Sequence, residues 1–156
     1  GLQIGFLAEH LDKALFVHNT RDPLSTMRSL LLARRKVYGD ETAWLSLKPA
    51  EYSDLKGLPV ADQLAGQVGG ALDDIRRACG RLGPERWMEV RYEDACAHPR
   101  LEALRVLRAV NALGGRVAED ASMLPERFPC RNGGGLSADE ARLLEAAARR
   151  RGLAPT

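Results

Sequence analysis

The sequence predicts an α/β protein with a parallel sheet and flanking helices. Two short apolar segments, residues 14–19 and 87–92, are rich in strand-forming residues. Segments with helical periodicity lie between them, and strands joined through helices pair in parallel. A sheet of only two parallel strands cannot cover both of its faces, so we expect a helix-rich fold that is incomplete within this chain.

The overall composition is that of an ordinary globular protein. Of the 156 residues, 45% are hydrophobic and 28% charged, which indicates a single domain over residues 1–156. The net charge of +2 is too small to favour a nucleic-acid partner. No apolar run approaches the roughly 20 residues that span a bilayer, and no basic and apolar leader opens the chain. We therefore expect a cytoplasmic protein without a membrane partner, and the oligomeric state stays open.

The first half contains three predicted helices. Apolar residues recur at helical spacing between Leu2 and Leu11. Asp22 and Pro23 provide an N-cap and a first helical residue, which predicts a helix that runs to about Tyr38. Its basic residues are expected on the polar positions: Arg28, Arg34, Arg35 and Lys36. A third helix is predicted over residues 60–82, where three glycines indicate either close packing or a kink: Gly66, Gly69 and Gly70.

The remaining segments are less regular. Residues 39–59 carry prolines and glycines around two aromatic residues, which predicts a long ordered loop that faces a substrate. After the second strand we expect a loop that Pro99 closes, then a helix whose apolar positions run from Leu101 to Val110 and which Gly114 and Gly115 end. Residues 114–135 are irregular. The last helix opens with a capping box of Ser137 and Glu140.

Neither the cysteines nor the histidines predict a metal or catalytic site. The three cysteines are odd in number and widely spaced, which is typical of neither a disulfide framework nor a zinc site: Cys79, Cys96 and Cys130. We expect all three to be small buried residues. His10 at a helix end and His18 within a strand are interpreted as structural, so the sequence identifies no general base.

Arg21 lies where an anion would bind. It follows the first strand and precedes a helix N-terminus, and in open α/β sheets ligands bind at this edge. Both the guanidinium and the helix dipole favour phosphate or sulfate. Ser29 and Ser25 share a flank of the helix. Local physics leaves two interpretations open: an anion site, or an Arg21 paired with a nearby carboxylate and serines that satisfy the helix backbone. Tyr92, after the second strand, should lie at the same sheet edge.

These segments together resemble a known family. Residues 14–23 with Ser29, eight positions after Arg21, and residues 86–94 with Pro99 are similar to the PAPS-dependent sulfotransferases. The R-D-P and R-Y-E-D-x-x-x-x-P blocks are nearest to the bacterial-type branch. The resemblance implies a P-loop-like α/β fold that transfers a sulfuryl group from 3'-phosphoadenylyl sulfate (PAPS) to a hydroxyl or amine.

The resemblance also implies roles for four residues. Arg21 and Ser29 would hold the 3'-phosphate of PAPS or of adenosine 3',5'-bisphosphate, Tyr92 would lie by the nucleotide, and Arg131 in an R-N-G-G-G loop would complete the site. The family's Gly/Ser/Thr-rich 5'-phosphosulfate loop has no counterpart in residues 1–156. His98 stands where the family commonly has Asp. We therefore expect the C-terminal portion of such a fold, which supplies the nucleotide anchor.

The sequence leaves two alternatives to this hypothesis. A non-catalytic nucleotide- or anion-binding module, acting through a partner chain, could carry the same residues. A nucleoside-kinase-like protein is disfavoured, because the chain has no GxxxxGK[ST] sequence. The acceptor substrate and the catalytic residues are not predicted.

Overall fold

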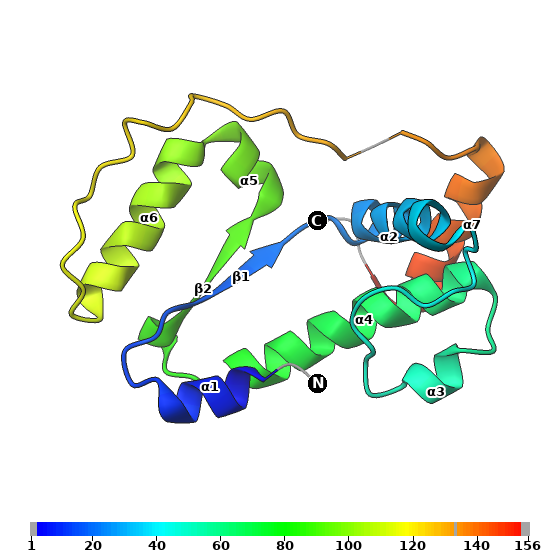
Figure 1. Cartoon of the computed structure of the whole chain (residues 1–156), viewed down its shortest axis with the longest axis horizontal. Helices are drawn as coiled ribbons and strands as arrows, with labels where there is room; N and C mark the ends of the chain where they lie inside the picture. Colours follow the sequence, from blue (N-terminus) through cyan, green and yellow to red (C-terminus); the bar gives the residue numbers. More distant parts are fainter. Residues whose placement is uncertain (1–2, 133, 154–156) are drawn as a thin grey trace. The chain divides into compact units, whose positions relative to one another are not determined.

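The computed structural model describes residues 3–132 and 134–153, which form a helix-rich α/β fold with two parallel strands in one sheet (Figure 1). The predicted class is therefore confirmed. Its elements are α1 (Ile4–His10), β1 (Phe16–Thr20), α2 (Pro23–Tyr38), α3 (Tyr52–Leu55), α4 (Val60–Cys79), a 3-10 turn (Pro84–Arg86), β2 (Trp87–Arg91), α5 (Tyr92–Ala97), α6 (Pro99–Ala112) and α7 (Ala138–Arg150). No helix in these two ranges is both long and apolar enough to cross a bilayer.

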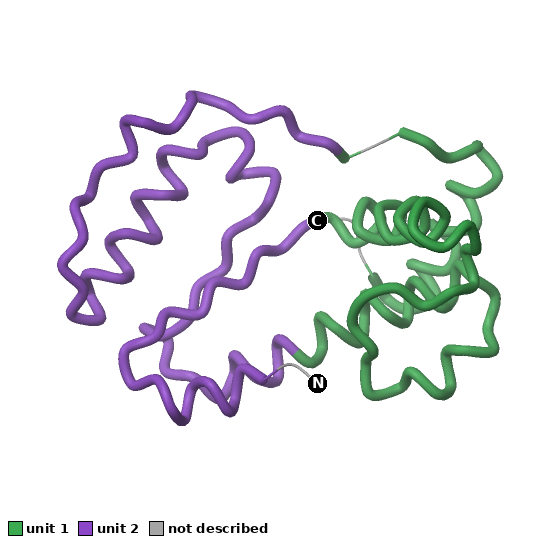
Figure 2. Tube along the Cα trace, viewed as in Figure 1, with its two compact units in different colours: residues 1, 22–74, 132–156 green, residues 2–21, 75–131 purple. Residues whose placement is uncertain are grey.

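The chain divides into two compact units (Figure 2). Among the described residues, unit 1 contains residues 22–74, 132 and 134–153, and unit 2 contains residues 3–21 and 75–131. Helix α4 begins in unit 1 and ends in unit 2. Each unit has its own buried residues and is treated separately below.

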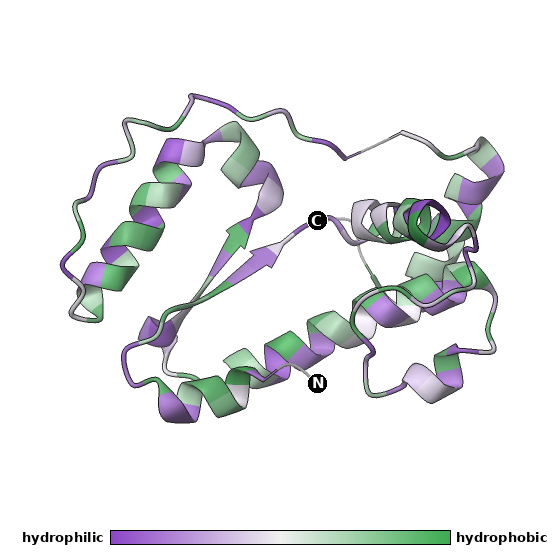
Figure 3. Ribbon diagram, viewed as in Figure 1, coloured by the Kyte–Doolittle hydropathy of each residue, from purple (hydrophilic) through white to green (hydrophobic). Residues whose placement is uncertain are grey.

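Unit 1 is built on α2, α7 and the first part of α4. The buried apolar residues of the three helices form one cluster: Met27, Leu31, Leu64, Ala65, Val68, Leu144, Ala147 and Ala148. Figure 3 shows hydrophobic and hydrophilic residues interspersed along α4, the pattern of a helix with one buried face. The predicted capping box is present at the start of α7, where Ser137 and Glu140 bond each other's backbone N–H.

The glycines of α4 mark close packing. A Cβ on Gly66 would lie 2.2 Å from the Leu55 side chain, and one on Gly70 would lie 2.6 Å from Cβ of Pro49. Both contacts bring the segment after α2 onto the helix, which continues without interruption through these positions. Of the two expectations for these glycines, close packing or a kink, close packing is confirmed. The same segment contains α3, a short helix that the sequence interpretation missed.

Arg34 is the main correction in α2. It was expected on the polar positions of the helix, yet its exposed fraction is 0%. Its guanidinium donates to Oε1 of Gln63 and of Gln67, each at 3.0 Å, and lies over the Trp44 ring at 5.0 Å. These neutral acceptors take the place of water, which allows a charged side chain to be buried.

Unit 2 contains the sheet. The strands pair from Phe16 with Trp87 to Thr20 with Arg91, so Val17 and Val90 lie on the same face. Strand β1 was expected to be mostly buried, which is wrong: its residues alternate between half-buried and exposed, and Val17 is 44% exposed. This alternation is typical of a strand with one covered face.

Helix α5 replaces the predicted loop after β2. Tyr92 to Ala97 are helical, and Pro99 is the first residue of α6 rather than the end of a loop. A proline fits that position because its missing N–H has no partner in a helix. His98 therefore lies at a corner between two helices.

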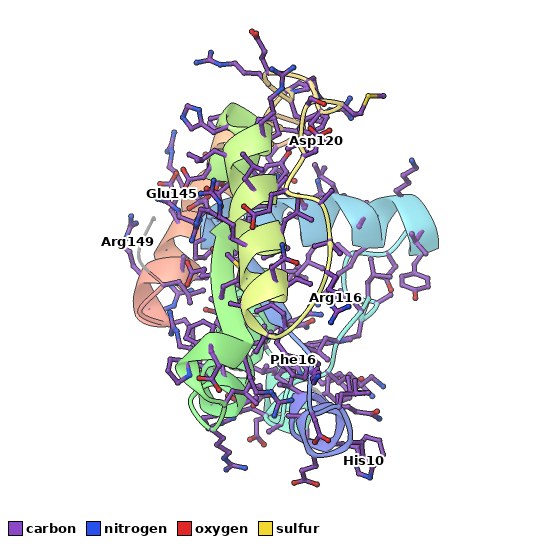
Figure 4. The ribbon with its side chains drawn as sticks, turned by 90° about the vertical axis from the view of Figure 1, so that its left-hand side faces the viewer. His10, Phe16, Arg116, Asp120, Glu145 and Arg149 are labelled. Atoms are coloured by element: carbon purple, nitrogen blue, oxygen red, sulfur yellow. The ribbon has the colours of Figure 1, made fainter. Side chains whose placement is uncertain are left out.

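An extended segment, residues 113–131, runs back along α6. Hydrogen bonds connect this segment to the two helices: Val117 to Asn111, Glu119 to Arg108, Leu124 to Arg100 and Phe128 to Cys96. Figure 4 shows this segment beside α6, with Arg116 and Asp120 on it. The irregular structure predicted for residues 114–135 is confirmed for this part, and the return path carries the chain from the end of α6 back to α5.

Candidate functional site

The junction of β1 and α2 has the predicted local form. The strand ends at Thr20, and the Asp22 carboxylate accepts a hydrogen bond of 2.7 Å from the backbone N–H of Ser25. Pro23 is the first residue of the helix. A capping carboxylate and a first-turn proline both stabilise a helix start, so the sequence itself fixes where α2 begins.

The two serines of α2 have different surroundings. The Oγ of Ser25 is buried and donates to the carbonyl of Asn132 at 3.2 Å. Ser29, one turn later, is exposed. Both residues belong to unit 1, whereas the other three predicted site residues belong to unit 2. The role of Ser29 stays a prediction.

Three of the predicted residues contact one another in unit 2 and are called the Arg21–Tyr92–Arg131 cluster. The Arg21 guanidinium lies over the Tyr92 ring, 4.8 Å from its centroid, and Nη2 of Arg21 donates to the carbonyl oxygen of Arg131. The backbone N–H of Arg131 in turn donates to the Tyr92 hydroxyl at 3.1 Å. Arg21 follows β1 and Tyr92 follows β2, and these strands are parallel. The two residues therefore lie at the same edge of the sheet.

A largely apolar pocket of about 540 Å³ adjoins the cluster. Tyr92 and Arg131 contribute to its wall, together with Val17 and Val90, which lie on one face of the sheet. The remaining lining comes from α5, α6 and the returning segment: Ala95, Cys96, Pro99, Glu102, Ala103, Val106, Leu124, Phe128 and Pro129. Such a volume suits a small organic molecule. A flat apolar group could lie in it while an attached anion meets the guanidinium of Arg21.

The histidines have surroundings that account for them without a ligand. Burial lowers the pKa of His18, although Glu89 acts in the opposite direction. The lowered pKa favours the neutral imidazole. Nδ1 of His10 lies 2.8 Å from the carbonyl oxygen of Phe6. His98 is exposed at the corner between α5 and α6. Within the described ranges, no group of three or more His, Cys, Asp or Glu side chains is placed to hold a metal ion.

The glycine-rich segments do not form a phosphate loop in the described residues. Gly69 and Gly70 lie inside α4, where the backbone N–H groups are used by the helix. In the predicted R-N-G-G-G loop, Gly133 lies outside the described residues. Gly134 and Gly135 have φ values of 102° and 83°, which favour glycine.

Several features of the site were not predicted. Cys79 and Cys96 are buried as expected, but Cys130 is exposed, so the expectation of three buried cysteines is wrong. Cys130 lies on the returning segment, which packs against α5 without covering that residue. Arg131 joins the cluster through its backbone N–H and carbonyl groups, which no side-chain pattern could indicate.

Comparison with known proteins gives one match. A family model described as "Sulfotransferase family" matches residues 2–112. No curated protein and no solved structure matches the chain significantly. The matched range contains Arg21, Ser29 and Tyr92 and ends before Arg131.

Proposed function

Because the chain belongs to the sulfotransferase family, we propose that it takes part in sulfuryl transfer from PAPS to a hydroxyl or amine acceptor. In this proposal the chain is the bacterial-type, C-terminal portion of the fold and supplies the 3'-phosphate side of the cofactor site. The observation that supports it best is the Arg21–Tyr92–Arg131 cluster beside an apolar pocket.

Each residue of the cluster has chemistry that suits a 3'-phosphoadenosine group. The Arg21 guanidinium can donate two parallel hydrogen bonds to a phosphate, and Ser29 would add a hydroxyl donor. The Tyr92 ring and the apolar pocket suit a flat base, since aromatic rings stack well on one another. Arg131 adds a second guanidinium. PAPS, when bound, supplies the sulfuryl group itself.

The Arg21 guanidinium has an acceptor within the cluster itself. The carbonyl of Arg131 accepts a hydrogen bond from the guanidinium that the phosphate would use. A bound phosphate would replace this neutral acceptor with a charged one, and charge-assisted hydrogen bonds are the stronger kind. The proposed site therefore exchanges a weaker contact for a stronger one on binding.

Titration calorimetry with adenosine 3',5'-bisphosphate tests the proposed site. We expect saturable binding, weakened by Tyr92→Ala through the loss of the ring and less by Tyr92→Phe, which removes only the hydroxyl bonded to Arg131. Aromatic stacking on a base contributes about 1–3 kcal/mol, so Tyr92→Ala should weaken binding by at least about fivefold. No heat from the chain under any condition would contradict the assignment.

A second assay tests how much of the reaction this chain carries out. PAPS labelled in its sulfuryl group is offered together with phenolic, alcoholic and amine acceptors. Labelled product would show that the chain completes the transfer by itself, which contradicts a role limited to the 3'-phosphate side of the site. Bisphosphate binding without transfer is the result expected of that role, and it is also the result expected of the alternative, a nucleotide-binding module that acts with a partner chain.

A further inference from the structure

Two of the three cysteines meet at the edge of the cluster. Cys96 lies in α5 and is buried, whereas Cys130 lies on the returning segment and is exposed. Cys96 is one of the groups that raise the pKa of the Cys130 thiol, so the two side chains are neighbours. Both residues belong to unit 2, so their proximity is a property of that unit.

The backbone holds the two thiols together. The N–H of Phe128, two residues before Cys130, donates to the carbonyl of Cys96 at 2.8 Å. On the other side, the N–H of Arg131 donates to the Tyr92 hydroxyl at 3.1 Å. Cys130 is thus fastened on both flanks to α5, the helix that carries its partner.

We propose that Cys96 and Cys130 are a redox-active pair whose disulfide locks the returning segment, residues 113–131, onto α5. Hydrogen bonds from Phe128 and Arg131 hold both flanks of Cys130 against α5, so the disulfide requires only a local adjustment of the segment and the two side chains. Cys79 is buried in α4 and serves as an internal reference thiol.

The reaction is a thiol–disulfide exchange with a small-molecule disulfide such as oxidised glutathione. The exposed Cys130 thiolate attacks the glutathione disulfide, forms a mixed disulfide and releases one glutathione thiolate. The Cys96 thiolate then attacks the Cys130 sulfur and releases the second glutathione. Two protein thiols are oxidised, one glutathione disulfide is reduced, and the two protons leave with the two glutathione molecules.

The surroundings of Cys130 give this reaction a pH dependence. Partial loss of water around its sulfur and the neighbouring Cys96 raise the pKa of the exposed Cys130, Glu93 adds to the rise, and Arg21 opposes it. Only the thiolate attacks, so the exchange accelerates as the pH rises toward that pKa.

The disulfide also affects the proposed nucleotide site. Cys130 directly precedes Arg131 in the chain, and the carbonyl of Arg131 accepts a hydrogen bond from the Arg21 guanidinium. A locked segment holds that carbonyl in place, and the oxidised form should bind adenosine 3',5'-bisphosphate more weakly than the reduced form. This consequence rests on the proposed function, whereas the disulfide itself does not.

The disulfide is tested on the folded chain by equilibration in glutathione buffers, alkylation of the remaining thiols and peptide mapping without reduction. We expect a linked Cys96–Cys130 peptide, with Cys79 left as a free thiol. Cys79→Ala should keep the linkage, and Cys130→Ser should abolish it. A mixed disulfide on Cys130 that never closes, or a linkage that involves Cys79, would overturn the proposal.

The lock is tested by limited trypsin digestion, because Arg116 and Arg127 are exposed on the segment. Oxidation should slow cleavage there several-fold in the natural chain and leave the rate unchanged in Cys130→Ser. Equal cleavage of both redox forms would overturn the lock even if the disulfide forms.

Calorimetry on the two redox forms separates this inference from the proposed function. Weaker bisphosphate binding by the oxidised form supports the regulatory consequence, and equal affinity overturns it. Absence of binding by both forms contradicts the proposed function and its regulation, while the mapped disulfide and the slower digestion continue to support the lock.

Discussion

Arg34 shows how one residue can organise a long segment. Its guanidinium is fully buried among the side-chain oxygens of Gln63 and Gln67, and it also donates to the Glu41 carbonyl at 3.1 Å. The two glutamines in turn donate to backbone carbonyls between Leu45 and Leu58. A cation, two amides and the loop backbone thus bond one another inside unit 1, while Nε of Arg34 is buried without a hydrogen-bond partner among the described residues. Burial lowers the pKa of Arg34.

Replacing Arg34 should destabilise unit 1. Arg34→Leu keeps the apolar stem but leaves the buried oxygens of Gln63 and Gln67 without a donor. Each unsatisfied buried polar group costs about 1–3 kcal/mol, so the two together should lower the free energy of unfolding by about 2–6 kcal/mol. Urea unfolding followed by the fluorescence of Trp44, in a Trp87→Phe background, measures the change. Arg116→Leu, which alters an exposed arginine, is the matched control.

An unchanged unfolding midpoint for Arg34→Leu would show that the polar network contributes no net stability. Sequence alone could not have placed Arg34 in the interior. Its charge and helical position both indicate the solvent side, and its partners lie 29 and 33 residues away. Burial here depends on tertiary contacts that only the folded chain contains.

The predictable elements are those whose ends are fixed by local chemistry. Asp22 with Pro23 and Ser137 with Glu140 fixed two helix starts correctly, because a cap acts on backbone groups within one turn. Helix α5 was missed because Pro99 was interpreted as the end of a loop, although proline is equally suited to open a helix. A proline alone does not say which of the two it does.

The capping box of α7 should make unit 1 sensitive to acid. The pKa of Glu140 lies at about 2, below its ordinary 4.5, first because the backbone N–H of Ser137 donates to its carboxylate and then because of Arg35. The folded chain therefore holds this proton less tightly than the unfolded chain. The stabilising effect is fully present above about pH 4.5 and is lost as the pH falls toward about 2.

Unfolding measured at a series of pH values across this window should show the difference. Glu140→Gln should flatten the fall in stability between about pH 5 and about pH 2.5, whereas Asp139→Asn in the same turn should keep it. If both variants retain the slope of the natural chain, the acid sensitivity arises elsewhere and the assignment to Glu140 is wrong.

Close packing against α4 predicts an unusual glycine effect. Gly70→Ala in a helix interior would ordinarily stabilise by about 0.5–1 kcal/mol. Here the new Cβ would lie 2.6 Å from Cβ of Pro49, and overpacking typically costs about 1–3 kcal/mol. We therefore expect Gly70→Ala to lower the thermal midpoint of unit 1, whereas Gly57→Ala, with nothing within 4 Å, leaves it near that of the natural chain. A higher midpoint for Gly70→Ala would contradict the close approach.

At the scale of the whole molecule, the described part of the chain passes between the two units three times, after Arg21, after Asp74 and after Arg131. Two of these passages begin at residues of the Arg21–Tyr92–Arg131 cluster. The sequence placed Arg21 and Tyr92 at one sheet edge, because strand order and parallel pairing follow from the helices between the strands. It could not show that Arg131 reaches Tyr92 through its backbone, 39 residues away.

The central claim is that Arg21 recognises a 3'-phosphate, and a ligand comparison tests it most directly. The affinities of adenosine 3',5'-bisphosphate and adenosine 5'-monophosphate are measured by calorimetry for the natural chain, Arg21→Ala and Arg116→Ala. The natural chain and Arg116→Ala should prefer the bisphosphate. In Arg21→Ala, the ratio of the two affinities should fall by about 10- to 100-fold. Hydrogen bonds to a charged group contribute about 1.5–3 kcal/mol, which corresponds to a factor of this size. A preference that survives intact in Arg21→Ala would contradict the account.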